Sequence, residues 1–341
     1  MDSIITFWEQ YQADVTRADK RLGLPVLASP ESYRIATDNA EEAVWLAQER
    51  KFEFPAIVKP CRGYSSDGVF HVGSLSELST AASSINTERH GNAFVVEKYC
   101  SGPEVDANFV LLDGEVIFFE SSDDFPKTAE DPSASTNGSN PVAAGNLHEL
   151  NSVFPSALPQ KELDLIRDNF HDIISRLGFK SGILHLEGLK PPTPWLIEIN
   201  PRPPGMKGTQ IIESTWGVDY WGLGMLLSFS DMPRVRALSQ PYELKPQYTC
   251  VMVFISAEYD PTCEGIFDSD GIFAELFARR PDLAQHVSRS GCLAARGQRI
   301  LYPHTAVNTF IAYFNVFSRV SRREAPELAD VVRQEVRFEF R

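Results

Sequence analysis

Two short segments of the chain, His185–Glu187 and Glu198–Arg202, combine residue types that bind metal ions and phosphates. Both lie in runs that alternate between polar and apolar residues, which is typical of β-strands with one face in a core. The apolar face consists of leucines and isoleucines. The opposite face carries the side chains that could do chemistry: His185, Glu187, Glu198, Asn200 and Arg202.

Pairing of these two strands would bring two carboxylates together. If residues 191–194 form a four-residue hairpin loop, Lys190 lies opposite Trp195 and Glu187 lies opposite Glu198. Two carboxylates about 5 Å apart repel each other unless a cation lies between them. Together with the amide oxygen of Asn200 they suit a hard ion such as Mg²⁺, which keeps waters and binds substrate phosphates. The alternative, an exposed strand face with solvated charges, is disfavoured by two glutamates, an asparagine and an arginine on one face.

A second candidate site follows an apolar strand expected over 54–59. Lys59 ends this strand, and the loop Gly63–Gly68 follows it, with Ser65 and Ser66 as further hydrogen-bond donors. Glycines let backbone N–H groups approach phosphate oxygens, and a nearby lysine neutralises their charge. The loop lacks the Gly-Lys-Ser/Thr ending of a Walker A loop, and no GxGxxG follows a strand. A plain turn between two strands is the alternative.

The strand expected over 93–99 ends in polar residues at a glycine-proline bend. Its end carries Glu97, Lys98, Tyr99 and Cys100, and Glu104 follows the bend. This arrangement predicts a hinge whose backbone groups meet the edge of a base. An ordinary strand end at the surface explains the same residues equally well.

The elements that must position these residues alternate between strands and helices. Helical patterns cover 4–11, 13–22, 39–50, 75–85, 161–177 and much of 205–228. Strand patterns cover 54–59, 69–72, 93–99, 105–112, 115–120, 183–189, 195–200 and 249–256. Asp113-Gly114 predicts a hairpin turn between two of these strands. Residues 126–146 are polar without periodicity, and a loop of that length is usually functional or disordered.

Composition excludes several classes of protein. The chain has 341 residues and a formal net charge of −14, without a basic block, so nucleic acid is not expected as a partner. The five cysteines are scattered without a CxxC pair, which argues against a disulfide framework or a structural zinc site. No apolar stretch approaches the roughly 18 residues of a membrane helix, and residues 1–10 do not form a secretory signal. We therefore expect a cytoplasmic protein that does not bind a membrane.

In this order and spacing the segments resemble the ATP-grasp superfamily, over about residues 18–230. The resemblance implies an α+β ATP-grasp fold, in which two α/β subdomains clasp ATP, followed by a C-terminal mixed α/β region. The implied parts are a short helical remnant over 1–23, an N-subdomain with the phosphate loop over 24–96, a C-subdomain with the magnesium site over 97–230 and a C-terminal substrate or lid region over 231–341.

The resemblance also implies a role for each site residue. The residues implied to bind the phosphates of ATP are Lys20 (next to Asp19), Lys59, Ser65, Ser66 and Gly68. Glu97, Lys98, Tyr99 and Cys100 are implied to bind the adenine, and Glu104 the ribose. The implied ligands of Mg²⁺, with Mn²⁺ as an alternative, are Glu187, Glu198 and Asn200. The implied substrate residues are His185, Arg202 and Gly205. Arg202 and Lys59 are the implied catalytic residues, since they stabilise the charge that develops during the reaction.

Within the superfamily, the segment 185–205 looks most like the L-amino acid ligase and carnosine synthase group. The resemblance implies that ATP phosphorylates a carboxylate and that an amine attacks the acyl phosphate, which gives an amide, ADP and phosphate. The implied substrates are a small carboxylic acid and an amine or amino acid. The alternatives are another ATP-grasp ligase or carboxylase chemistry, or a non-catalytic ATP-binding scaffold.

The sequence departs from the family pattern near its beginning. Members of the family carry an N-terminal α/β domain before the Asp-Lys element, whereas only 18 residues precede Asp19 here. The missing domain usually forms one wall of the acceptor site. We expect a truncated gene product, a partner that supplies this wall, or use of the C-terminal region in its place. A homodimer is the alternative to such a partner. The segment 126–146 is expected to be either a lid over the acyl phosphate or a disordered insertion.

Overall fold

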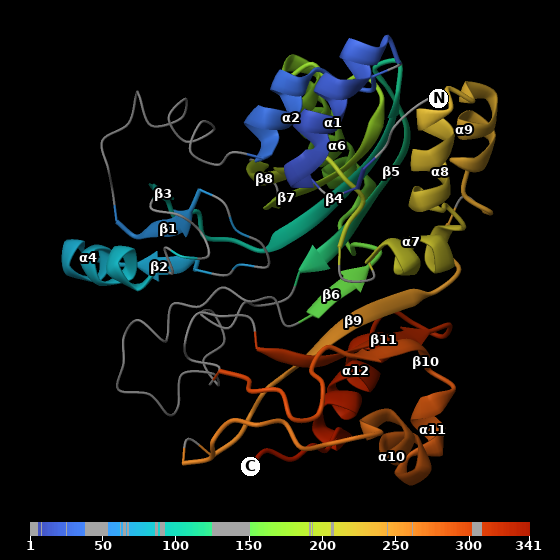
Figure 1. The fold of residues 1–341 in the computed structure, drawn as a ribbon. Coiled ribbons are helices and arrows are strands. Elements are labelled where there is room, and N and C mark those ends of the chain that lie inside the picture. Colours follow the sequence, from blue (N-terminus) through green and yellow to red (C-terminus); the bar gives the residue numbers. More distant parts are fainter. Residues whose placement is uncertain are drawn as a thin grey trace. The chain divides into compact units, whose positions relative to one another are not determined.

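The computed structural model describes most of the chain, and the helices and strands of Figure 1 lie within these residues. The described residues are 6–7, 9–24, 26–37, 54–61, 63, 66, 68–85, 88, 93–124, 151–190, 192, 194–205, 208–243, 245–260, 262–301 and 309–341. They belong to two compact units. Unit 1 comprises residues 1–42, 100–124 and 154–247, and unit 2 comprises residues 43–99, 125–153 and 248–341.

Four antiparallel strands in the order β5-β4-β7-β8 organise unit 1. Their bounds are Glu104–Leu112 for β4, Glu115–Asp124 for β5, Gly182–Leu189 for β7 and Trp195–Asn200 for β8. Asp113 and Gly114 join β4 to β5 with φ angles of 53° and 85°, so the hairpin turn predicted there is confirmed. Because side chains alternate along each strand, this sheet has one apolar and one polar face.

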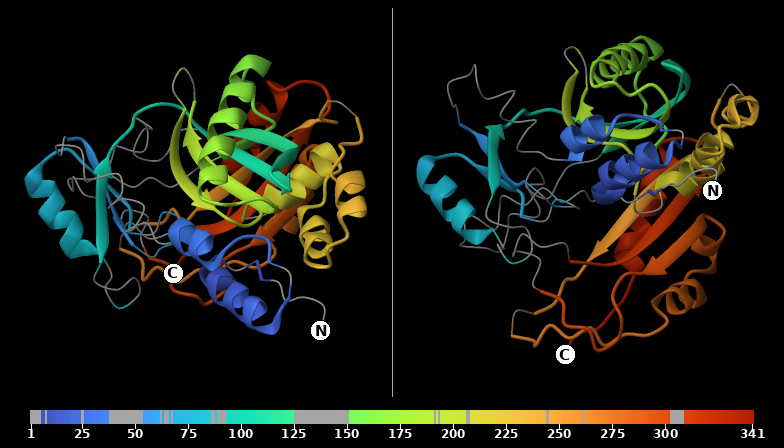
Figure 2. Two further views of the ribbon diagram at one scale, coloured as in Figure 1. Left: turned by 90° about the horizontal axis from the view of Figure 1, so that it is seen from above. Right: turned by 45° about the horizontal axis from the view of Figure 1, so that its top comes forward.

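Helices cover the apolar face of these strands. Helix α6 (Gln160–Arg176) contributes Ile166, Phe170 and Ile174, spaced four residues apart, to a core with Phe109 and Leu186. The first two helices, α1 (Glu9–Leu22) and α2 (Pro30–Thr37), lie beside the same sheet (Figure 2). The described residues of this unit also form α7 (Gly208–Trp216), α8 (Tyr220–Ser228) and α9 (Met232–Leu238).

A small three-stranded sheet in unit 2 carries the segment around Lys59. Its antiparallel order is β2-β1-β3, with β1 over Ala56–Pro60, β2 over Phe70–Val72 and β3 over Phe94–Lys98. Helix α4 (Leu75–Ser84) begins after Ser74, whose Oγ accepts from the N–H of Glu77 at 3.3 Å, while Glu77 accepts from the N–H of Gly73. This reciprocal cap starts the helix that covers the sheet.

Unit 2 also contains a second antiparallel sheet in the order β10-β11-β9. Its strands are β9 (Thr249–Ser256), β10 (Val287–Cys292) and β11 (Phe310–Ser318). The helices α10 (Ile272–Arg279), α11 (Pro281–Ala284) and α12 (Glu324–Glu335) contribute to the core beside these strands. The strand β6 (Asn151–Phe154) adds Val153 to this core, and its Asn151 accepts a hydrogen bond from Arg333 at 2.6 Å.

The expected fold class is confirmed as α+β. The N-terminal segment differs from expectation where it is described: α1 continues from Glu9 to Leu22 without the break expected at residue 12, because no residue there interrupts a helix. The helix expected over 39–50 and the loop expected over 126–146 lie outside the described residues. Among the helices that the structure describes, none combines the length and apolar character needed to cross a bilayer.

Candidate functional site

The polar face of the unit 1 strands gathers acidic and amide side chains in two rows. Strand pairing aligns Glu120, Asn108, His185 and Asn200 in one row, from β5 across to β8. The neighbouring row consists of Ser122, Asp106, Glu187 and Glu198. All of these side chains are buried except Glu187 and Glu198, which are partly exposed. Such a concentration of buried polar groups costs folding free energy and therefore suggests a functional surface.

The pairing of Glu187 with Glu198 is confirmed. The two residues are direct partners in the β7–β8 ladder, as are His185 and Asn200. The turn side of the hairpin was predicted wrongly, because Leu189 and not Lys190 lies opposite Trp195. A β-bulge between Glu187 and Gly188 produces this one-residue shift, since an extra residue of β8 is accommodated there.

The residues around this carboxylate pair suit a magnesium ion. Asn200 donates from Nδ2 to Oε1 of Glu187 at 3.4 Å, and its Oδ1 accepts from Nη2 of Arg202 at 3.1 Å. The amide oxygen has two lone pairs, so one stays available to a metal. In the described part of the chain no three His, Cys, Asp or Glu side chains form a metal cluster. Two carboxylates and one amide oxygen instead leave coordination positions for water and phosphate oxygens, as Mg²⁺ prefers.

A chain of buried hydrogen bonds holds His185 beside this pair. Asn108 donates from Nδ2 to Oε1 of Glu120 at 2.5 Å, and its Oδ1 lies 2.9 Å from Nδ1 of His185. Because a carbonyl oxygen only accepts, Nδ1 of the histidine carries a proton. The other ring nitrogen, Nε2, faces Oε1 of Glu187 at 3.4 Å and Oδ1 of Asp106 at 4.0 Å. The strands thereby fix both the orientation of the ring and the position of one of its protons.

Glu120 at the far end of this chain has an unusual environment. Burial raises the pKa of its carboxyl to about 7, and the hydrogen bond from Asn108 and the charge of His185 only partly oppose this effect. The charge of Glu120 in turn adds to the burial that raises the pKa of Tyr220 on α8. Asp106, Asn108 and Glu120 were not predicted from the sequence. The signal was present in β4, where Glu104, Asp106 and Asn108 alternate with apolar residues.

The residues proposed for the phosphates and the adenine lie mainly in unit 2. Lys59 on β1 forms an ion pair with Glu97 on β3, with 2.9 Å between Nζ and Oε1. Tyr99 donates its backbone N–H to the carbonyl of Pro55 at 3.1 Å, and its ring packs against His71. Ser66 and Gly68 both have positive φ, as expected of a tight loop, whereas Ser65 lies outside the described residues. Lys98 is exposed at the end of β3.

The remaining predicted site residues belong to unit 1. Lys20 is exposed in the last turn of α1, while its neighbour Asp19 is buried. Cys100 is half-buried before β4, and Glu104 is buried at the start of that strand, two residues before Asp106. Gly205 accepts a backbone hydrogen bond from Gly208 at 2.9 Å. Arg202, six residues before the start of α7, donates to the carbonyl of Pro203 as well as to Oδ1 of Asn200.

Comparisons with known proteins agree with this fold. The family described as "D-ala D-ala ligase C-terminus" matches residues 19–123. The chain is 48% identical, over its whole length, to the ATP-grasp enzyme fsqD of Aspergillus fumigatus, and it spans 66% of the length of that relative.

Solved structures extend the likeness to the fold. An L-amino acid ligase from Bacillus licheniformis superposes with a TM-score of 0.73 at 20% identity, covering 100% of this chain and 81% of that one. A phosphoribosylglycinamide synthetase from Anaerococcus prevotii superposes with a TM-score of 0.60 at 13% identity, covering 98% of this chain and 81% of that one. The fold is the ATP-grasp fold. The chain belongs to the ATP-grasp superfamily, and its relatives fit the resemblance found in its sequence.

Proposed function

We propose that the chain is an ATP- and Mg²⁺-dependent carboxylate–amine ligase that forms an amide, dipeptide-like bond and releases ADP and phosphate. The observation that carries this proposal is the pairing of Glu187 with Glu198 across β7 and β8, tied through Asn200 to Arg202. Two facing carboxylates next to an amide and a guanidinium are suited to holding a metal–phosphate complex and an anionic substrate side by side. The name of the 48% identical relative, an ATP-grasp enzyme, supports the same class.

The proposed reaction has two steps. A carboxylate oxygen of the acid attacks the terminal phosphorus of ATP, the bond to the bridging oxygen breaks, and ADP leaves. The amine nitrogen then attacks the acyl carbon, phosphate leaves with the electron pair of the broken C–O bond, and the nitrogen loses a proton to form the amide. A bound Mg²⁺ supplies charge neutralisation at the phosphates during the first step.

The residues of this chain would act on the substrates as follows. Glu187, Glu198 and Asn200 provide oxygen ligands for the metal, and the guanidinium of Arg202 binds the acid and stabilises the negative charge at the acyl centre. His185 orients the substrate from the same face, because its ring is held by Asn108. Lys59 and Lys20 are proposed to bind phosphate oxygens, which for Lys59 requires exchange of its ion pair with Glu97.

Release of phosphate and ADP tests the proposal. The purified protein is incubated with Mg-ATP and a panel of amino acids and small dicarboxylic acids, singly and in pairs. We expect ADP, and not AMP, to appear only with a suitable acid and amine. Glu198→Gln should lower kcat by about 10²-fold or more, as is typical when a group that stabilises transition-state charge is lost. Glu115→Gln, at an exposed glutamate of β5, is the matched control and should keep full activity.

Two outcomes would contradict this function. ATP binding without turnover on any pair would favour a non-catalytic ATP-binding protein. Turnover that survives Glu198→Gln would refute the metal assignment. Whether the protein forms a homodimer or binds a partner stays a prediction, which a size measurement on the same preparations tests. The division into subdomains over 24–96 and 97–230 also stays a prediction, and limited proteolysis tests it.

A further inference from the structure

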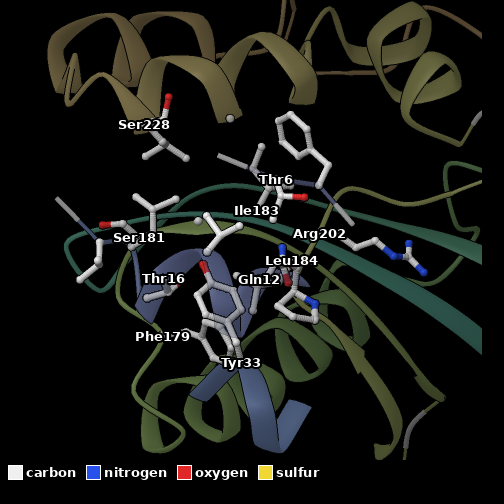
Figure 3. A pocket seen from close by; sticks show the side chains of 18 of the residues that line it. Thr6, Gln12, Thr16, Tyr33, Phe179, Ser181, Ile183, Leu184, Arg202 and Ser228 are labelled. Atoms are coloured by element: carbon white, nitrogen blue, oxygen red, sulfur yellow. The ribbon is translucent and has the colours of Figure 1, made fainter. Parts of the chain in front are cut away.

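A cavity in unit 1 lies beside the candidate site but is formed largely by other elements. Its volume is about 200 Å³, and its wall comes from α1, α2, the start of β7, the segment after β8 and the helices α8 and α9 (Figure 3). An engineered apolar cavity of about 150 Å³ binds benzene, so this space suits a small organic ligand. Arg202 forms part of the wall, so the cavity adjoins the substrate side of the carboxylate pair.

One face of α1 turns polar side chains into this cavity. Gln12, Thr16 and Asp19 follow one another at four and three residues, which places them on the same side of the helix. All three are more than nine-tenths buried. A buried helix face normally carries apolar side chains, so three polar residues there need a reason other than packing.

Gln12 has an acceptor that is buried and unused. Its Nε2 donates to the carbonyl of Pro201 at 2.5 Å, which fixes the amide. Its Oε1 has no hydrogen-bond partner among the residues that the structure describes. Leaving such an acceptor unsatisfied costs about 1–3 kcal/mol, so a ligand that brings an N–H donor gains affinity there.

The charge of the cavity wall also favours a cationic donor. The buried carboxylate of Asp19 lies on the same helix face, and Tyr33 brings a hydroxyl whose pKa is raised to about 12 by burial and by Asp19. Arg202, the only cation among the described lining residues, directs its guanidinium to Asn200 and Pro203. The remainder of the wall is mainly apolar, with Val15, Phe179, Ile183, Leu184 and Leu227.

We propose that this cavity binds a small primary ammonium compound, with Gln12 and Asp19 as acceptors for its N–H groups and the apolar wall around its carbon chain. The inference rests on the proposed function only in one respect: in the ligase, the bound compound would be the amine substrate. Binding itself does not require turnover, and so the two proposals fail separately.

Isothermal titration calorimetry measures the affinity of the protein for n-butylammonium. Two compounds of similar size, uncharged n-butanol and anionic butyrate, serve as comparisons. We expect the wild-type protein to bind n-butylammonium at least tenfold more tightly than either comparison compound. Asp19→Asn should weaken n-butylammonium binding by tenfold or more, because a charge-assisted hydrogen bond is lost. Asp14→Asn, on the exposed side of the same helix, is the control and should leave binding unchanged.

Two results would overturn the proposal. The first is equal binding of the three compounds, or no binding, by the wild-type protein, a comparison that needs no variant to fold. The second is an Asp19→Asn protein that binds n-butylammonium as wild type does. Glu198→Gln distinguishes this site from the ligase proposal, since it should lower the kcat of ATP turnover by about 10²-fold or more while n-butylammonium binding stays unchanged.

Discussion

Replacing Glu120 with glutamine should change how the stability of the protein depends on pH. Glu120 is 2% exposed, and the pKa of its carboxyl is raised from 4.5 to about 7. Since the folded state binds this proton more tightly than the unfolded state, stability is highest when the carboxyl is protonated and decreases as pH rises from about 4.5 to 7. The groups that face Glu120 include Asn108 on β4, His185 on β7, Trp216 on α7 and Tyr220 on α8.

The size of the effect follows from this pKa difference. At about 1.4 kcal/mol per pH unit, the interval from 4.5 to about 7 corresponds to about 3 kcal/mol of unfolding free energy. Glutamine has the shape of the protonated acid, keeps an oxygen to accept the hydrogen bond from Asn108 and does not ionise. The advantage of Glu120→Gln over wild type should therefore grow by up to this amount between pH 4.5 and 7 and stay constant above it.

Urea unfolding at a series of pH values from 4.5 to 8.5, followed by tryptophan fluorescence and circular dichroism, measures this difference. Other groups titrate over the same range in both proteins, so only the difference between the two curves is informative. Glu115→Gln, at an exposed position of the same strand, should run parallel to wild type. Equal pH dependence of Glu120→Gln and wild type would refute the assignment of Glu120 as a neutral buried acid.

Three further substitutions test other parts of the structure. Gly188→Ala places a Cβ 2.4 Å from the ring of Phe170 and should cost about 1–3 kcal/mol in urea unfolding, and an unchanged midpoint would contradict the close packing. Gly114→Ala meets no atom within 4 Å but retains φ of 85°, so a loss of about 1 kcal/mol is expected from backbone conformation alone. Glu335→Gln should lower the thermal midpoint at pH 7 and lower it progressively less as pH falls below 4.5, because Arg280 and Arg279 hold the pKa of Glu335 below that value; a loss that does not change with pH would contradict this ion pair.

The local part of the site could be predicted from sequence. His185, Glu187, Glu198 and Asn200 lie on two strands joined by a short connection, so alternation and the length of the turn are sufficient to pair them. The predicted pairing is correct at Glu187 and wrong by one residue at Trp195, because the polar–apolar pattern of the sequence does not reveal a β-bulge.

The rest of the site depends on contacts between segments distant in sequence. Asn108 and Glu120 become partners of His185 only because β4 lies between β5 and β7 in the sheet. The two strands and the hairpin turn that joins them could be recognised from the sequence, but the pairing of β4 with β7 could not. The cavity could not be predicted from the sequence for the same reason. Nothing in the sequence distinguishes Gln12 from an ordinary helical residue, and its hydrogen bond to Pro201, 189 residues later, is visible only in the structure.

The bulge in the β7–β8 hairpin has a consequence for how such chains can vary. On the side of the bulge away from the turn, Glu187 pairs with Glu198. On the turn side, Gly188 pairs with Leu196, so the strand register differs by one residue between the two sides. A residue gained or lost in the connection over 190–194 can be absorbed by a change at the bulge, before it reaches the carboxylates. The turn can thus drift in length and sequence over evolution while the geometry that its strands present to a ligand is preserved.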